Sequence, residues 1–181
     1  MCTWTIRDSQ AHHEAGHVVV ARLLGLEVSE SRIHDPDGGG STFIESIVDV
    51  RHELLVALAG IVAQIVFDAM CDGVPETHVN FHRRGMAGWD LDVAGRCIRR
   101  LTALVDQFEI QRHYDEISEE LVSWIAQSAE WNSVHYLATQ LSSVGTVHGK
   151  QLDEILRSVG SQEVQLLTIL DRLLVQPEDS T

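Results

Sequence analysis

The chain is short of basic residues. Lys and Arg together number 13, against 27 Asp and Glu, which gives a formal net charge of −14 at pH 7. Nucleic acids and anionic membrane surfaces attract basic proteins, so this composition disfavours both as partners. We therefore expect no nucleic acid and no membrane among the binding partners.

Cysteine is also scarce. The three cysteines, Cys2, Cys71 and Cys97, lie far apart, are odd in number and lack the C-x-x-C spacing. This pattern predicts neither a disulfide framework nor a thiolate zinc site. We expect reduced thiols in a cytoplasmic protein.

No secretory signal or long hydrophobic run is evident. The N-terminus lacks a basic region that leads into an apolar stretch. The longest apolar stretch, residues 54–67, is interrupted by Gln64 and is too short to span a bilayer comfortably, so we interpret it as a buried core helix. The sequence contains neither a G-x-G-x-x-G motif nor a P-loop, so no nucleotide site is visible.

The most informative feature that is present is the pentad His13-Glu14-Ala15-Gly16-His17, which has the pattern H-E-x-x-H. On a helix, His13 and His17 lie four residues apart and project from one face, so two imidazoles can meet one metal ion. Glu14 projects in another direction and is not placed to be a third ligand, but it can reach a water at an open metal position. We therefore interpret Glu14 as a general base.

The segment around the pentad has the composition of a nearly buried helix. Asp8 or Ser9 can cap its start, and Gly25 follows its end. Burying polar groups without partners is costly, so His13, Glu14 and His17 need a reason to be there. His12 points to a different face and is interpreted either as a surface residue or as one that contacts a metal ligand without binding the metal itself. The apolar positions are Ala11, Ala15, Val18, Val19, Ala21, Leu23 and Leu24.

The remaining pattern predicts a mainly α (α+β) fold. Residues 28–33 and 42–44 are expected to form a hairpin around a turn at 35–40 that is rich in Gly, Pro and Asp. Helices are expected near residues 49–71, 90–108, 113–129, 132–144, 150–158 and 162–175, with a long loop over 71–89. The length of 181 residues suits one domain with a helical appendage.

A catalytic zinc ion generally takes three protein ligands and a water, so a third ligand must come from elsewhere in the chain. The residues alone leave the choice open, and Asp90 could equally be the N-cap of a helix that follows Gly88. The candidates are Asp90, Asp92, His78, His82, Glu53 and Asp68.

The order of motifs resembles the FtsH-type, M41 zinc metallopeptidases. These commonly carry H-E-A-G-H followed by small apolar residues, here Val18 to Val20. Residues 58–67 stand where the family has L-x-G-R-x-A-E-x-x-x-F, residues 89–91 where it has N-D-L, and residues 146–152 where it has T-L-x-G-x-x-L. The chain departs from this pattern at Ile61, Gln64 and Trp89, which replace Arg, Glu and Asn.

The resemblance implies a zinc metalloendopeptidase that hydrolyses flexible or unfolded polypeptides. By resemblance Asp90 is the third zinc ligand beside His13 and His17, and Glu14 is the catalytic base. The family's ATPase module and membrane helices have no counterpart in these residues, so we expect a free-standing peptidase domain over residues 1–158 and a helical appendage with a frayed tail over 159–181.

Several alternatives stay open. Residues 41–44 could present a strand edge to an extended substrate or be an ordinary edge strand. The apolar stripe of residues 162–174 could pack on its own domain or pair with another subunit in a homo-oligomer, and a separate ATPase could deliver substrates. The rival function is a non-catalytic protein-binding module on the same scaffold, with zinc in a structural role.

Overall fold

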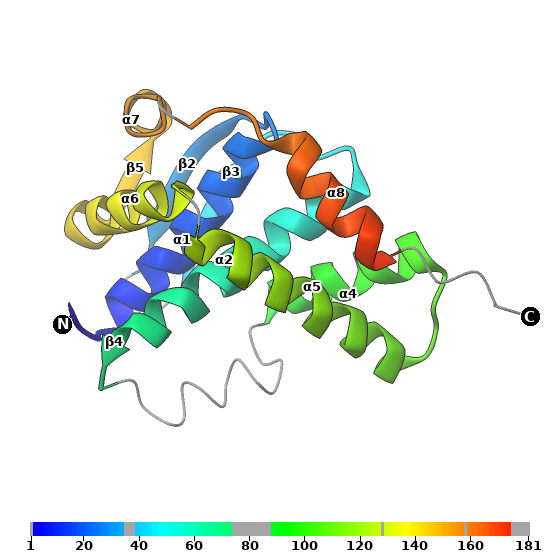
Figure 1. Ribbon diagram of the computed structural model, residues 1–181. Coiled ribbons are helices and arrows are strands. Elements are labelled where there is room, and N and C mark those ends of the chain that lie inside the picture. Colours follow the sequence, from blue (N-terminus) through cyan, green and yellow to red (C-terminus); the bar gives the residue numbers. More distant parts are fainter. Residues whose placement is uncertain (1, 35–38, 74–87, 128, 158, 175–181) are drawn as a thin grey trace, which may run out of the picture.

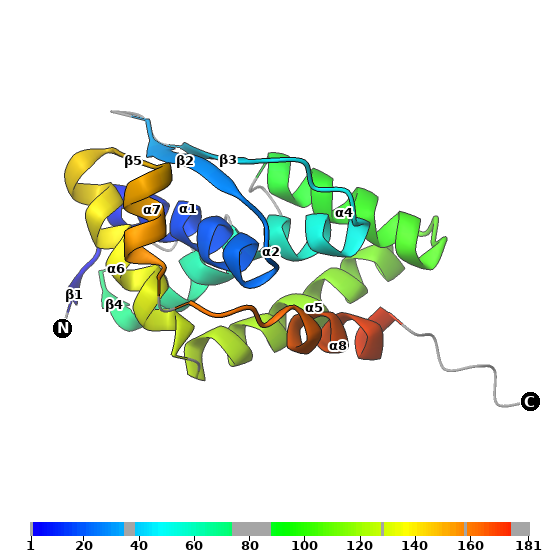
Figure 2. The same cartoon turned by 90° about the horizontal axis from the view of Figure 1, so that it is seen from above.

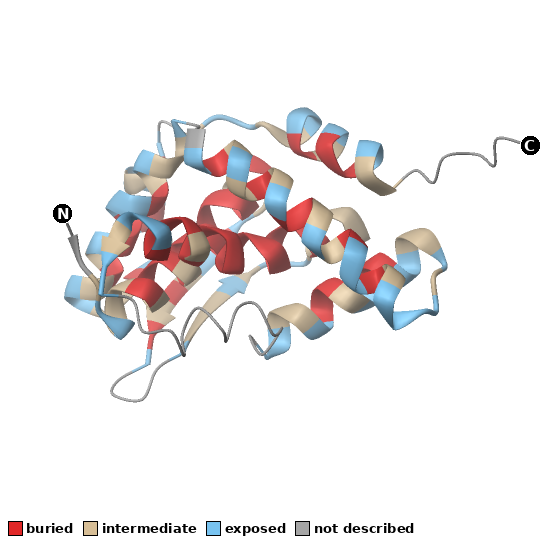
Figure 3. Ribbon diagram, turned by 60° about the horizontal axis from the view of Figure 1, so that its bottom comes forward, coloured by how far each residue is buried: buried red, intermediate tan, exposed pale blue. Residues whose placement is uncertain are grey.

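The computed structural model describes residues 2–34, 39–73, 88–127, 129–157 and 159–174 (Figure 1). Seven helices account for 71% of these described residues, and a small antiparallel sheet accompanies them. The prediction of a mainly α fold is confirmed at this level. Buried residues fill the centre of the molecule (Figure 3).

Helix α1 (Ile6–Leu23) carries the H-E-x-x-H pentad. Its N-cap is Thr5, whose hydroxyl accepts a hydrogen bond from the backbone N–H of Asp8 at 3.1 Å, so the expected cap at Asp8 or Ser9 is wrong. At the other end Gly25 takes a φ of +74°, as expected of a residue that follows a helix.

Helix α2 (Val50–Met70) packs along α1 at very close range. A Cβ at Gly16 of α1 would lie 2.4 Å from the carbonyl oxygen of Ala59, so only glycine allows this approach. By length and composition α2 could cross a membrane, but 72% of its most apolar window is buried inside the protein. It is a core helix, as expected, and its bounds agree with the helix predicted near residues 49–71.

The three-stranded antiparallel sheet has the order β3-β2-β5, with β2 (Val28–Ile33) in the centre. Strand β3 (Gly40–Ile44) completes the expected hairpin and begins two residues earlier than predicted. Strand β5 (Thr146–His148) was not predicted. Figure 2 shows the sheet on one side of α1 and α2, with α5 and α8 on the opposite side.

Five further helices complete the described fold: α4 (Trp89–Thr102), α5 (Gln107–Gln127), α6 (Glu130–Val144), α7 (Gly149–Ile155) and α8 (Glu163–Leu174). Helix α4 ends earlier than expected because Ala103 adopts a left-handed φ of 58°. Helix α5 begins earlier because the Asp106 carboxylate accepts hydrogen bonds from the backbone N–H groups of Phe108 and Glu109.

Helix α8 packs against α5 of its own chain. Leu166 and Leu170 belong to the same hydrophobic core as α1 and α2, while the outer side of α8 is exposed (Figure 3). The helical part of the expected appendage therefore covers the domain. The expected frayed tail, residues 176–181, lies outside the described residues.

The N-terminal strand corrects the expectation about cysteines. Strand β1 (Cys2–Thr3) pairs in parallel with β4 (Cys71–Asp72), and the register places Cys2 opposite Cys71. Cys71 is disulfide-bonded, whereas Cys97 is free and buried. The prediction of reduced thiols throughout is therefore wrong. The spacing of the cysteines in the sequence could not reveal that β1 and β4, which are distant in the chain, pair in the fold.

Candidate metal centre

The structure brings His13, His17 and Asp90 together. The two histidines project from one face of α1, and their Nε2 atoms lie 3.0 Å apart. Asp90, from the first turn of α4, places Oδ2 2.9 Å from His13 Nε2 and 3.5 Å from His17 Nε2. One ligand atom from each residue lies within 4.8 Å of the other two, although Asp90 is 77 residues from His13.

Asp90 is not the helix cap. The N-cap of α4 is Gly88, so Asp90 lies inside the first turn, where its side chain is turned toward α1. Asp92, also in the first turn, is exposed. Two other candidates have partners elsewhere, because Glu53 contacts Arg100 and Asp68 contacts Ser9. His78 and His82 lie outside the described residues. Of the described candidates, Asp90 alone belongs to the cluster.

Carbonyl oxygens orient both imidazoles. His17 Nδ1 lies 2.7 Å from the backbone oxygen of Val56, and His13 Nδ1 lies 3.2 Å from Oε1 of Gln64. A carbonyl oxygen only accepts, so each Nδ1 donates a proton to it. Each Nε2 is then the nitrogen at which a metal ion would replace the proton directed at Asp90. Gln64, which replaces the Glu of the resembled family, thus still supplies an acceptor to His13.

The cluster has the chemistry of a site that needs a positive charge. Two nitrogen lone pairs and a carboxylate oxygen converge on one point, and they repel one another unless a proton or a metal ion lies between them. Burial lowers the pKa of His17, but the hydrogen bond and the charge of Asp90 outweigh it and raise the pKa to about 9. Burial raises the pKa of Asp90, but the hydrogen bonds of His13 and His17 outweigh it and hold the pKa below its usual range.

The donor set fits zinc. Two imidazole nitrogens and one carboxylate oxygen form a three-ligand set typical of catalytic zinc, which leaves a position for water. Gly60 of α2 faces the same point, where a Cβ would lie 2.4 Å from His17 Nε2 and 2.8 Å from His13 Nε2. The absence of a side chain at this position leaves room beside the ligand atoms.

Glu14 is buried next to the edge strand of the sheet. Its Oε2 accepts a hydrogen bond from the Thr42 hydroxyl of β3 at 2.7 Å. A Cβ on Gly40, also in β3, would lie 2.5 Å from Glu14 Oε1, so the strand passes directly over the carboxylate. The contact with Thr42 was not predicted, because nothing in the sequence links the hairpin to one helix position.

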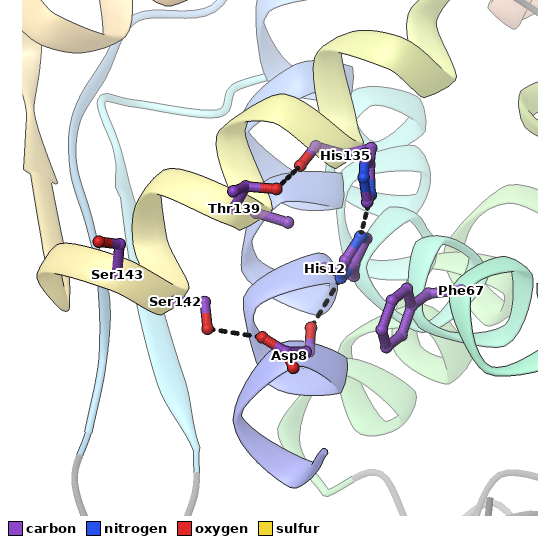
Figure 4. A pocket seen from close by; sticks show the side chains of 8 residues that line it. Asp8, His12, Phe67, His135, Thr139, Ser142 and Ser143 are labelled. Carbon is purple, nitrogen blue, oxygen red and sulfur yellow. Dashed lines mark hydrogen bonds between the residues drawn. The ribbon is translucent and has the colours of Figure 1, made fainter. Parts of the chain in front are cut away.

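His12 lies on another face of α1, but it is buried, so the expectation of a surface residue is wrong. Its Nδ1 donates to the backbone oxygen of Asp8 at 2.7 Å, its Nε2 lies 3.0 Å from Nδ1 of His135, and its ring stacks on Phe67 (Figure 4). Burial is the main reason that the pKa of His12 falls to about 4. These residues line a pocket of about 280 Å³ between α1 and α6 that contains none of the three clustered residues.

No model of a known protein family matches the chain, and no curated protein sequence matches it. The function must therefore be argued from the chemistry of the site.

Proposed function

We propose that the chain is a zinc-dependent metalloendopeptidase that resembles the FtsH type and cleaves flexible polypeptides. The observation that carries the proposal is the convergence of Asp90 on His13 and His17 across 77 residues of sequence. Helical spacing accounts for the meeting of the two histidines, but an ordinary helix pair has no need of a carboxylate at that point. Three converging ligands beside a buried glutamate are what hydrolytic zinc sites require.

His13, His17 and Asp90 would hold the ion. When bound, zinc would polarise the scissile carbonyl and bring the pKa of water from 15.7 toward about 7. Glu14 would take the proton of the attacking water and later deliver it to the departing amine, which is typically worth about 10²–10⁴ in rate. The hydroxyl of Thr42 holds the carboxylate of Glu14 in place by donating to Oε2.

The edge of β3 supports the assignment of an extended substrate. Within the described sheet β3 pairs only with β2, so its other edge can receive a further strand. A polypeptide that adds to this edge would run past Gly40 and Thr42, and therefore past Glu14. Backbone pairing needs a segment without fixed structure, so unfolded chains are the expected substrates and compact domains are not.

The test is to compare the wild type with Glu14→Gln. We expect about one zinc ion per chain in both proteins, and loss of about 10²-fold or more in cleavage of a quenched, unfolded polypeptide by the variant alone. Glu27→Gln, which alters an exposed glutamate, is the matched control and should retain activity. If Glu14→Gln cleaves at the wild-type rate, Glu14 is not the base and the proposed mechanism is wrong. If zinc-loaded wild type cleaves nothing, the peptidase proposal is wrong and the non-catalytic binding module is favoured.

A further inference from the structure

A row of hydrogen bonds leads from His13 away from the metal cluster into the core. Gln64 Oε1 lies 3.2 Å from His13 Nδ1, and the Gln64 amide Nε2 donates to Ser9 Oγ at 2.8 Å. Ser9 Oγ in turn donates to Oδ1 of Asp68 at 2.9 Å. The row links α1 and α2 three times, because His13 and Ser9 lie on α1 and Gln64 and Asp68 lie on α2.

The far end of the row is a buried carboxylate with two donors on one oxygen. Asp68 is 8% exposed, and its Oδ1 also accepts a hydrogen bond from Trp4 Nε1 at 2.7 Å. The indole N–H of Trp4 only donates, so Oδ1 is an acceptor, and the Ser9 hydroxyl on the same oxygen donates to it as well. Ser9 and Gln64 are themselves 0% and 7% exposed, so water has little access to disturb the order.

The direction of the row matters because an amide can be turned around. Gln64 could present either its oxygen or its NH₂ group to His13, and the two orientations require opposite tautomers of the imidazole. Since the hydroxyl proton of Ser9 goes to Asp68, the Ser9 oxygen is left to accept, and Gln64 must turn its NH₂ group toward Ser9. The amide oxygen then faces His13 and requires a proton on Nδ1.

We propose that Asp68, acting through Ser9 and Gln64, is a positioning residue that holds His13 in the tautomer able to bind metal. The inference deepens the proposed function and rests on its metal site. This role explains why the carboxyl group of Asp68 is buried in the apolar helix α2. Two hydrogen bonds, through Ser9, separate it from Gln64, the residue that contacts His13. Hydrogen bonds that point one way along a row also polarise one another, so each bond strengthens the next one toward His13.

The decisive variant is Asp68→Leu, which keeps the size of the side chain but accepts no hydrogen bond. Without that acceptor the Ser9 hydroxyl can turn and donate to the oxygen of Gln64, and the reversed amide would present NH₂ to His13. We expect zinc affinity to fall about 10- to 100-fold, the usual effect of losing an outer partner of a metal ligand. In the metal-free protein the ¹⁵N shifts of the His13 ring should show that Nδ1 loses its proton, while Nε2 keeps the one directed at Asp90.

A second change should restore what the first removes. In Asp68→Leu combined with Gln64→Glu, a carboxylate contacts His13 directly and only accepts, so both the affinity and the Nδ1 proton should return to nearly wild-type values. Ser9→Ala breaks the row while leaving Asp68 unchanged, and it should weaken zinc binding if Asp68→Leu does not fold. Asp153→Asn, at an exposed ion pair with Arg22, is the control and should change neither readout.

Unaltered zinc affinity in both Asp68→Leu and Ser9→Ala would overturn the inference. A loss of affinity with the proton still on Nδ1 and no recovery in the double variant would also overturn it, because that result indicates a purely structural role. The peptidase proposal fails separately: zinc-loaded wild type that cleaves no polypeptide refutes that proposal, while loss of the Nδ1 proton in Asp68→Leu would still support the role of Asp68.

Discussion

Gly60 offers the sharpest test of the metal site, because it can be changed without touching a ligand. A Cβ at this position would lie 2.4 Å from His17 Nε2 and 2.8 Å from His13 Nε2. Ordinary contacts between carbon and nitrogen need about 3.4 Å or more, so the methyl group of Gly60→Ala is about 1 Å too close to one ligand atom and about 0.6 Å too close to the other.

These overlaps can be compared with the tolerance of zinc. Bonds from zinc to imidazole nitrogen are about 2.0–2.1 Å long, and a workable site keeps its distances to within about 0.2 Å. To reach an ordinary contact distance from the new methyl group, Nε2 of His17 would have to move by about 1 Å, which is several times that tolerance. We expect the zinc affinity of Gly60→Ala to fall more than about 100-fold, or more than about 2.7 kcal/mol.

The stability of the metal-free fold should change much less. Overpacking a core costs about 1–3 kcal/mol, while replacing glycine by alanine inside a helix gains about 1 kcal/mol. These two effects partly cancel, so the free energy of unfolding should fall by no more than about 2 kcal/mol. Loss of zinc with a nearly normal metal-free fold is therefore the expected signature.

The assay is a competition for zinc against a chromophoric chelator, together with thermal unfolding of the metal-free protein. Gly95→Ala in α4 is the control, because a Cβ there meets nothing within 4 Å and only the gain in helix propensity remains. A Gly60→Ala variant that binds zinc as tightly as the wild type would refute the placement of the metal beside Gly60.

Three other predictions follow from the site. Gly40→Ala should abolish hydrolysis but keep zinc, because its Cβ would come within 2.4–2.6 Å of the Glu14 side chain; a zinc-loaded variant with wild-type turnover contradicts this. Asp90→Ala should weaken zinc binding by more than about 100-fold, whereas Asp92→Ala should not, and equilibrium dialysis of both variants checks it. The raised pKa of His17, about 9 in the metal-free fold against 6.5 unfolded, stabilises that fold below pH 6.5, and this contribution is lost as the pH rises through about 9. Because zinc must displace the same proton, its apparent affinity should rise about tenfold per pH unit between about 7 and 9, and a flat profile would show that His17 is not a ligand.

The sequence predicted the parts of the site that depend on local spacing. His13 and His17 share a face because they are four residues apart on a helix, and this holds wherever the helix packs. Asp90 is different, since no periodicity connects it to α1 and six candidates remained until the resemblance favoured one of them. Its position beside the histidines depends on how α4 packs against α2, which is a tertiary property.

The shortest elements escaped prediction for a related reason. Strands of two or three residues, such as β1, β4 and β5, have no usable alternation, so the parallel pair that aligns Cys2 with Cys71 could not be read from the chain. The burial of His12 depends on the neighbouring helix α6, which covers that face of α1. One signal was available but unused: Gln64 and Asp68 lie four residues apart in a helix that is otherwise apolar there, which indicates a shared polar partner.

The replacement of Glu by Gln at position 64 raised a question about the metal site, and charge balance gives a physical answer. If zinc binds as proposed, Asp90 and Glu14 carry two negative charges close to an ion of charge +2, so the buried centre is formally neutral. A further carboxylate beside His13 would leave excess negative charge in a region that disfavours it. Gln64 supplies the acceptor that His13 needs without adding a charge. The next carboxyl group, Asp68, accepts hydrogen bonds from Ser9 and Trp4 and does not contact His13. The difference from the resembled family at position 64 is therefore compatible with a zinc centre whose charge is balanced by Asp90 and Glu14.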